Sequence, residues 1–359
     1  MIDIIPISNP ELWDNIVLCF PNADIYYHRG YVEAFRIHGD GEPMLILYEG
    51  DCCKGICVMM KRDVADDPHF KGLIPAGKYF DMVTPYGYGG FIFDQTPTLN
   101  EKQHLKAEIT EALIHEGVVA AFFRFHPVLD NPSDSKDIVD VIDLGHTIAL
   151  DLSSPEMIWE NIISKNRNMI RKAEKSGVEI RHGKGMDLLN KFREIYDETM
   201  RHDNAERYYF FEKEFYESID KDLHDNYEIF YACYEGEIIA MSIMLFSGKQ
   251  MHYHLSGSRY EYRRLAPSNL LLYKAALWGN EQGFNTFHMG GGVGSGEDSL
   301  YKFKAAFNRN SDYRFSIGKI IFNSEAYDYL SDLRGLSKEE KDAIGFFPVY
   351  RANQEVKRL

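Results

Sequence analysis

The sequence has few cysteines, no long apolar run and a deficit of positive charge. Its five cysteines form an odd set without a pairing framework, which is typical of a reducing compartment such as the cytoplasm. Three of them lie close together between residues 52 and 57, but a second ligand cluster that would complete a zinc pattern is missing, so we expect no metal site. We also expect no membrane span, since no run of about 18 apolar residues occurs, and no signal peptide, since the first 20 residues lack a positive region and an apolar core.

The charge balance argues against a general nucleic-acid binder. The 40 Lys and Arg residues against 55 Asp and Glu give a net charge of −15, so any polyanionic partner needs a local basic patch. The length of 359 residues suits two domains, which we place at 1–150 and 151–359. Aromatic residues make up 14% of the chain, which favours large packed interfaces or a surface that stacks on sugars or bases.

The predicted elements occur in the same order twice: strand, two helices, two hairpin strands, strand, helix, strand. Tyr-Glu-Gly turns at 48–50 and 234–236 mark the two hairpins, and Gly117 and Gly283 end the two later helices. The second copy opens with one long helix over 155–176 and is completed by a helix at 298–308 and a strand at 313–322. Alternating strands and helices with hairpins predict an α/β fold with mixed sheets, duplicated, with a join near 145–155.

A glycine-rich loop follows the strand that ends near residue 289. It holds Gly290, Gly291, Gly292, Gly294 and Gly296. The loop fits neither the dinucleotide-binding pattern nor the P-loop pattern, because the third glycine and the Lys-Ser/Thr pair are missing. Two interpretations remain open: a floor beside a transfer site with backbone amides facing a carbonyl or an anion, and a plain connection capped by Asp298 or Ser299.

Two lysines lie on the helix predicted after this loop, Lys302 and Lys304. Lys304 borders an expected buried stripe more closely than Lys302 does; the stripe is Leu300, Phe303, Ala306 and Phe307. A fixed ammonium there would stabilise a developing oxyanion or bind a carboxylate or phosphate. The alternative is a surface lysine whose stem covers apolar neighbours.

The strand at 250–258 carries candidate polar groups. Strict alternation puts His252, His254 and Ser256 on one face and Tyr253 on the other. His254 is a candidate general base, and packing or hydrogen bonding is the alternative role. Since no Ser-His-Asp or Cys-His spacing occurs, we expect direct transfer between bound donor and acceptor without a covalent intermediate.

Two further regions contain candidate binding residues. Asp81, Tyr86 and Tyr88 lie in a Pro/Gly-rich loop, where the tyrosines either contact an acceptor sugar or peptide or fill a seam. Arg167 and Arg171 lie four residues apart on a basic helix, a row that suits phosphates of a nucleotide-linked acceptor or a tRNA, or that is a solvated face.

Several segments resemble the Fem-type aminoacyltransferases and their relatives, which contain two tandem GNAT-like acyltransferase domains. They are SKNRNMIRKAEKSGVEI (164–180), MVTPYGYGG (82–90), HYHLSGS (252–258), FHMGGG with SLYKFKAAF (287–307), and FFPVYR (346–351). The resemblance implies that Lys304, in the F-K-x-x-F pattern with Phe303, lies near the transferred group. It implies substrate contacts for Ser268 at a helix start and for Tyr208 in an Arg-Tyr-Tyr segment.

One segment departs from the acetyl-CoA-dependent pattern. Arg263 and Arg264 are present, but Ala266 and Ser268 replace the expected glycines and Pro267 removes an amide donor.

We therefore expect a transferase that moves an acyl or aminoacyl group from an activated ester or thioester to an amine of a cell-envelope precursor or another glycoconjugate. The donor is an aminoacyl-tRNA or an acyl-CoA, and no cofactor is tightly bound. The alternatives are an acetyl-CoA-dependent N-acetyltransferase for a nucleotide sugar or small amine, and a non-catalytic relative that binds glycans or peptides.

Overall fold

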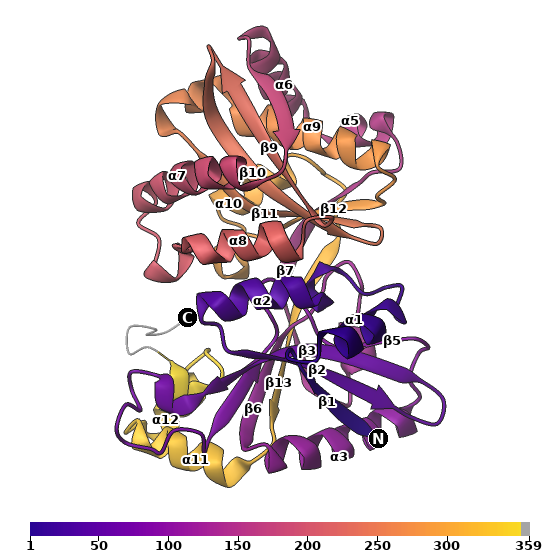
Figure 1. The fold of residues 1–359 in the computed structure, drawn as a ribbon, viewed down its shortest axis with the longest axis vertical. Coiled ribbons are helices and arrows are strands. Elements are labelled where there is room, and N and C mark those ends of the chain that lie inside the picture. Colours follow the sequence, from indigo (N-terminus) through magenta and orange to yellow (C-terminus); the bar gives the residue numbers. More distant parts are fainter. Residues whose placement is uncertain (353–359) are drawn as a thin grey trace. The chain divides into compact units, whose positions relative to one another are not determined.

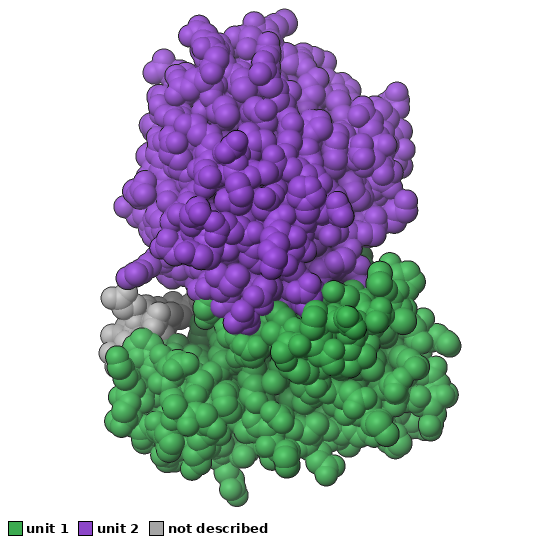
Figure 2. Space-filling model, viewed as in Figure 1, with its two compact units in different colours: residues 1–21, 39–143, 316–359 green, residues 22–38, 144–315 purple. Residues whose placement is uncertain are grey.

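The computed structural model describes residues 1–352; residues 353–359, the end of the predicted second domain, lie outside the described residues. The chain forms two compact units, coloured separately in Figure 2. Unit 1 comprises Met1–Pro21, Gly39–Asp143 and the chain from Ser316 onward, and unit 2 comprises Asn22–His38 and Leu144–Phe315. Each unit is therefore built from segments that are separate in the sequence.

Unit 1 contains a mixed sheet in the order β1-β2-β3-β4-β6-β13, with β5 beside β3 (Figure 1). Neighbouring strands are antiparallel except β4 and β6, which are parallel. The strands are β1 (Ile2–Pro6), β2 (Glu42–Glu49), β3 (Lys54–Asp63), β4 (Phe80–Val83), β5 (Ile92–Phe93), β6 (Val118–Arg124) and β13 (Tyr313–Ile321). A core of aliphatic and aromatic side chains from β2, β3, β4 and β6 packs against α3 (Leu99–His115), which Thr98 caps.

Unit 2 repeats this arrangement in the order β8-β9-β10-β11-β12-β7, and here β11 and β12 are the parallel pair. Its strands are β7 (Asp140–Asp151), β8 (Glu179–Gly183), β9 (Tyr227–Tyr234), β10 (Glu237–Ser247), β11 (Gln250–Ser258) and β12 (Thr286–Gly290). The core combines apolar side chains of these strands with those of α6 (Ser164–Lys175) and α9 (Pro267–Glu281). The predicted duplicated α/β fold is thus confirmed.

The remaining helices connect the strands. They are α1 (Pro10–Leu18), α2 (Arg29–His38), α4 (Pro132–Ser135), α5 (Pro155–Asn161), α7 (Met186–His202), α8 (Lys213–Asp222), α10 (Ser299–Ala305), α11 (Ser324–Leu333) and α12 (Lys338–Ala343). Six 3-10 turns add η1 (Ile25–Tyr27), η2 (Val64–Asp66), η3 (Arg207–Tyr209), η4 (Tyr260–Leu265), η5 (Val293–Ser295) and η6 (Val349–Arg351). Within the described residues, no helix is both long and apolar enough to cross a membrane.

The last strand of each sheet comes from the other half of the sequence. β7 pairs antiparallel with β12, although it directly follows the elements of unit 1, and β13 pairs with β6, although it follows those of unit 2. Segment 22–38 is likewise part of unit 2, where α2 packs against α8. The order of elements in the sequence does not reveal these exchanges.

The single helix predicted over 155–176 is wrong: the structure has two helices, α5 and α6, separated by Ile162 and Ile163 in extended conformations. Ile162 is fully buried, and the Ile163 amide donates to the Ala306 carbonyl at 3.1 Å. Ile162 and Ile163 therefore give up helical hydrogen bonds. In return, Ile162 packs in the core and Ile163 hydrogen-bonds the segment after α10. Tertiary contacts therefore override a continuous helical pattern.

Candidate functional site

The parallel strands of unit 2 separate after a short stretch of pairing. β11 and β12 are paired at three positions, which end at His252 opposite His288. β11 then continues to Ser258 alongside β10, while β12 runs into the glycine loop. The side chains around this opening form the candidate site.

Lys304 reaches across the opening from α10. Its Nζ donates to the Gly291 carbonyl at 2.7 Å and lies 6.0 Å from the centre of the Tyr253 ring. The residue is only 8% exposed, whereas Leu300, predicted to be buried, is 39% exposed. The burial of Lys304 excludes the surface-lysine interpretation. Burial lowers the pKa of Lys304 to about 8, although the nearby Asp298 carboxylate opposes this shift.

The glycine loop is shaped by close backbone contacts. A Cβ on Gly292 would lie 2.3 Å from the Gly296 carbonyl oxygen and 2.4 Å from Asp298 Oδ1. Asp298 caps α10 by accepting from the Tyr301 amide at 2.8 Å, and it accepts from the Val293 amide at 3.2 Å. Gly290 and Gly294 have positive φ angles of 76° and 62°. The glycines let the loop fold onto the cap, and Gly291 presents its carbonyl to Lys304.

A β-bulge changes which side chains share a face of β11. The register with β10 shifts between Met244, opposite Tyr253, and Ile243, opposite Leu255, so His254 is the extra residue. The Tyr253 hydroxyl hydrogen-bonds Ser256 and Ser242, so these groups share one face. The prediction that Ser256 lies with the histidines is therefore wrong, because strict alternation fails at a bulge.

His254 lies in an aromatic environment on the opposite face. Its ring meets those of Tyr31 and Phe35 of α2 edge-on, with centroids 5.9 and 6.1 Å apart. Burial, with a small contribution from His252, lowers the pKa of His254 to about 3. An imidazole with that pKa is neutral near pH 7 and is a weak proton acceptor.

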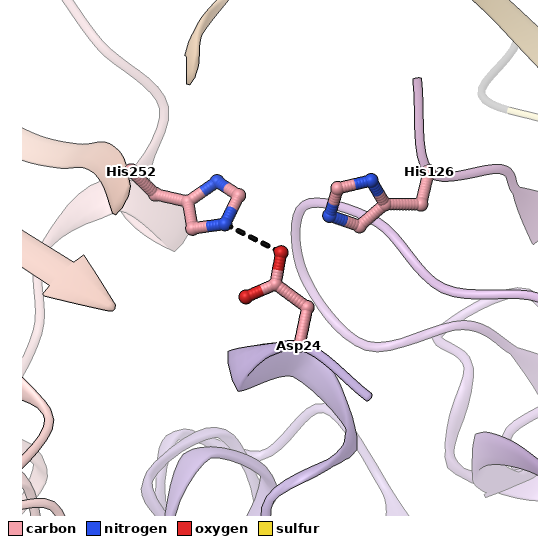
Figure 3. Close-up of side chains that lie close together, drawn as sticks. All are labelled: Asp24, His126 and His252. Atoms are coloured by element: carbon pink, nitrogen blue, oxygen red, sulfur yellow. Dashed lines mark hydrogen bonds and ion pairs between the residues drawn. The ribbon is translucent and has the colours of Figure 1, made fainter. Parts of the chain in front are cut away.

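The neighbouring His252 pairs with a carboxylate that the sequence predictions missed. Asp24 Oδ2 lies 2.7 Å from His252 Nε2, and both residues are almost fully buried (Figure 3). His252 Nδ1 lies 3.3 Å from the hydroxyl of Tyr26. Asp24 and Tyr26 come from segment 22–38 of unit 2, and 228 residues separate Asp24 from His252, so sequence spacing gives no signal for this pair. His126, the third residue labelled in Figure 3, belongs to unit 1.

The predicted residues of unit 1 have structural partners there. Asp81 is fully buried and forms ion pairs with Arg62 (2.7 Å) and with Arg351 of η6. Tyr88 lies 5.8 Å from the ring of His126, and its burial raises its pKa, while Tyr86 is half-buried. A substrate-binding role for these three residues stays a prediction.

The basic helix α6 lies beside the start of α9. Asn269 Nδ2 of α9 donates to Asn166 Oδ1 of α6 at 2.7 Å, and Asn166 Nδ2 donates to the Ala306 carbonyl after α10 at 3.3 Å. Arg167 and Arg171 lie over the Trp159 ring, at 5.9 and 5.1 Å from its centre. The three helices α6, α9 and α10 therefore meet at one place in unit 2.

Of the remaining predicted residues, Ser268, Phe303 and Lys302 lie on α9 and α10, and Tyr208 lies apart from these helices. Ser268 is in the first turn of α9, Phe303 packs on the core beside Phe307, and Lys302 is exposed on α10. Tyr208 is apart: it lies on η3, is 39% exposed, and its carbonyl is 2.8 Å from His38 Nε2.

Comparisons with known proteins place this geometry in a fold. Residues 163–304 match the model of the acetyltransferase (GNAT) domain, a range that begins just before α6 and ends at Lys304. FemX has a similar structure, with a TM-score of 0.67 and 15% identity over 91% of this chain and 99% of FemX. A conserved protein of unknown function from Bacteroides thetaiotaomicron is similar with a TM-score of 0.57 and 13% identity, over 89% of this chain and 100% of that one. The search among curated proteins found no match.

Residues 163–304 thus resemble a GNAT acetyltransferase domain, and a fold similar to that of FemX spans most of the chain.

Proposed function

We propose that this protein transfers an acyl or aminoacyl group from an activated ester or thioester to an amine, at the opening between β11 and β12 of unit 2. The observation that carries the proposal is the buried Lys304, held by the Gly291 carbonyl beside Tyr253. Burying a cation costs free energy, so a buried lysine is a candidate functional residue. Lys304 also lies within the range that matches the acetyltransferase domain model.

The proposed chemistry is positioning and electrostatic stabilisation. When the amine attacks the acyl carbonyl, negative charge develops on the carbonyl oxygen. The ammonium of Lys304 carries three N–H bonds, one of which Gly291 uses, so two others serve the developing oxyanion. The Tyr253 hydroxyl, with its pKa raised by burial, stays a neutral hydrogen-bond donor at the same face.

The junction of α6, α9 and α10 supports a phosphate-bearing donor. Amide groups at the start of α9 favour an anion, and α6, which Asn166 joins to this start, carries Arg167 and Arg171 over Trp159. The similarity to FemX favours an aminoacyl-tRNA donor and an amine on a cell-envelope precursor. The GNAT domain match favours the second candidate, an acetyl-CoA-dependent N-acetyltransferase for an amino sugar nucleotide or small amine.

The test is a donor-by-acceptor screen read by mass spectrometry. Donors are charged tRNA and acetyl-CoA; acceptors are amine-bearing cell-wall precursors and nucleotide amino sugars. For the pair that turns over, Lys304→Ala should lower kcat by about 10²–10³, the usual effect of losing an oxyanion donor. Lys274→Ala is the matched control, because Lys274 forms an exposed ion pair with Glu174 on α6.

The outcomes separate the candidates. Unchanged turnover in Lys304→Ala contradicts the proposed role of Lys304. Micromolar CoA binding by calorimetry, with turnover of acetyl-CoA alone, favours the second candidate over the first. A protein that binds an acceptor but turns over neither donor is a binding relative.

A further inference from the structure

The Asp24–His252 pair lies at the point where β11 and β12 separate. His252 is the last residue of β11 that pairs with β12, and the next residue, Tyr253, faces Lys304. The two faces of the opening therefore carry different chemistry. One face has the Lys304 ammonium and Tyr253, and the other has the pair of His252 and Asp24, which Figure 3 shows.

We propose that His252 is the proton acceptor of the transfer reaction, an inference that rests on the proposed function. Asp24 is its positioning residue, and Tyr26 is the group that passes the proton. An ionised carboxylate only accepts hydrogen bonds, so Asp24 Oδ2, 2.7 Å from Nε2, fixes the N–H on Nε2. The lone pair of Nδ1 then faces the Tyr26 hydroxyl, 3.3 Å away, which donates to it.

The buried pair is built rigidly. The other Asp24 oxygen, Oδ1, accepts from the Ile25 amide at 2.6 Å, which fixes the carboxylate at the start of η1. The Tyr26 ring meets the His252 ring edge-on at 5.1 Å, so imidazole and phenol hold each other in place. A fixed carboxylate stabilises the imidazolium that forms when Nδ1 takes a proton.

The reaction step balances without another reagent. The amine nitrogen forms a bond to the acyl carbon, and the donor's C–O or C–S bond breaks. The amine proton moves to the Tyr26 oxygen while the Tyr26 proton moves to Nδ1. The imidazolium then returns a proton through Tyr26 to the released alkoxide or thiolate.

His252 suits this role better than His254. Among the described residues of unit 2, the titratable groups that face His252 include Asp24 and Tyr26 from segment 22–38, His288 on β12 (ring centroids 5.7 Å apart) and His254 on its own strand. Asp24 is the one carboxylate among these four, and its negative charge favours the protonated imidazole of His252. His254 is surrounded by aromatic rings, which disfavour its charged form.

The kinetic test uses the donor–acceptor pair found by the screen. His252→Gln should lower kcat by about 10²–10³ with KM changed less than about threefold, and should remove the ascending limb of the pH profile. Asp24→Asn should lower kcat by about tenfold or more and shift that limb, and Tyr26→Phe should lower kcat in the same range. His182→Gln is the matched control, because His182 also lies 2.7 Å from a carboxylate, that of Glu228, but in an exposed position on β8.

A second test needs no substrate. In ¹⁵N-histidine NMR of the whole chain, neutral His252 should carry its proton on Nε2. A neutral form with its proton on Nδ1 overturns the proposal. Spectra of His252→Gln assign the signal.

The two proposals fail in distinguishable ways. If Lys304→Ala abolishes turnover but His252→Gln keeps the wild-type pH profile, the transferase stands and the role of His252 is overturned. If no donor is used, the proposed function fails, and the NMR spectra still decide which ring nitrogen of neutral His252 is available to accept a proton.

Discussion

The two units repeat one fold but differ where their parallel strands end. In unit 1 the segment after β4 stays paired with β6: Thr84 accepts from the Arg124 amide at 3.0 Å, and Gly89 donates to the Arg124 carbonyl at 2.8 Å. Asn131 then ties the Gly89 and Phe91 carbonyls to the His126 amide. In unit 2 the equivalent pairing ends at His252, and a lysine lies across the opening.

The comparison bears on which unit holds the proposed transfer site. In unit 1 these backbone groups are paired within the chain, which leaves fewer of them for a ligand to bind. A strand pair that separates beside a buried ammonium offers hydrogen-bonding groups to a substrate. Buried charge shows the same contrast: Asp81 of unit 1 is neutralised by two arginines, whereas Lys304 of unit 2 is held by a carbonyl.

Arg351→Ala should produce the largest loss of stability, and it should act on unit 1. Removing this partner leaves the fully buried Asp81 with Arg62 alone and also breaks the 3.3 Å pair with Asp67. Breaking a buried ion pair costs about 3–5 kcal/mol, so the unfolding transition of unit 1 should fall while kcat of the folded enzyme is kept. Calorimetry with parallel turnover assays measures both; a loss of kcat at unchanged stability would mean that Asp81 has a substrate role.

The charge on Lys304 should make the stability of unit 2 depend on pH in the alkaline range. Its pKa is about 8 in the folded chain and 10.5 in the unfolded one. Between these values the unfolded chain binds more protons, so stability rises with pH, by about 3 kcal/mol in total. Lys304→Met removes this contribution, so the difference in unfolding free energy between wild type and variant should change by that amount from about pH 7.5 to pH 10.5. A constant difference in chemical denaturation across this range would show that Lys304 is not desolvated.

Asn131→Ala should open the strand connection in unit 1 without affecting transfer. The side chain is 3% exposed and makes hydrogen bonds of 2.9 and 3.1 Å to two carbonyls and 2.9 Å to one amide. Leaving these backbone groups unpaired costs about 2–3 kcal/mol. Urea unfolding should show the loss, with kcat unchanged at a temperature where unit 1 is folded; a parallel fall in kcat would contradict the division of roles between the units.

Gly292→Ala should have the smallest effect on stability, about 1–2 kcal/mol, because the new Cβ meets the Gly296 carbonyl and the Asp298 carboxylate. Displacing Asp298 should also lower turnover by moving α10 and Lys304. Gly296→Ala is the matched control in the same loop, since its φ is −86° and the nearest atom to its Cβ among the described residues lies at 3.7 Å. Equal behaviour of the two variants would show that the glycine loop does not position Lys304.

Much of the fold was predictable because local chemistry marks it. The cap at Asp298 is confirmed, as are the two Tyr-Glu-Gly hairpins and the repeated order of elements. Two predictions failed where the local pattern does not decide the structure. Ile162 and Ile163 interrupt the predicted helix because Ile163 pairs with the segment after α10. The bulge at His254 places Ser256 on the face of Tyr253 and not on that of the histidines.

The sequence by itself determined the spacing of apolar residues, the duplicated order of elements, the glycine loop and the place of Lys304 on the helix after it. These features depend on residues close together in the chain. Only the tertiary structure decided that Lys304 is buried against Gly291, that β7 and β13 complete the sheet of the other half, and that Asp24 meets His252. Those features depend on packing between segments up to 228 residues apart, and no local spacing encodes such contacts.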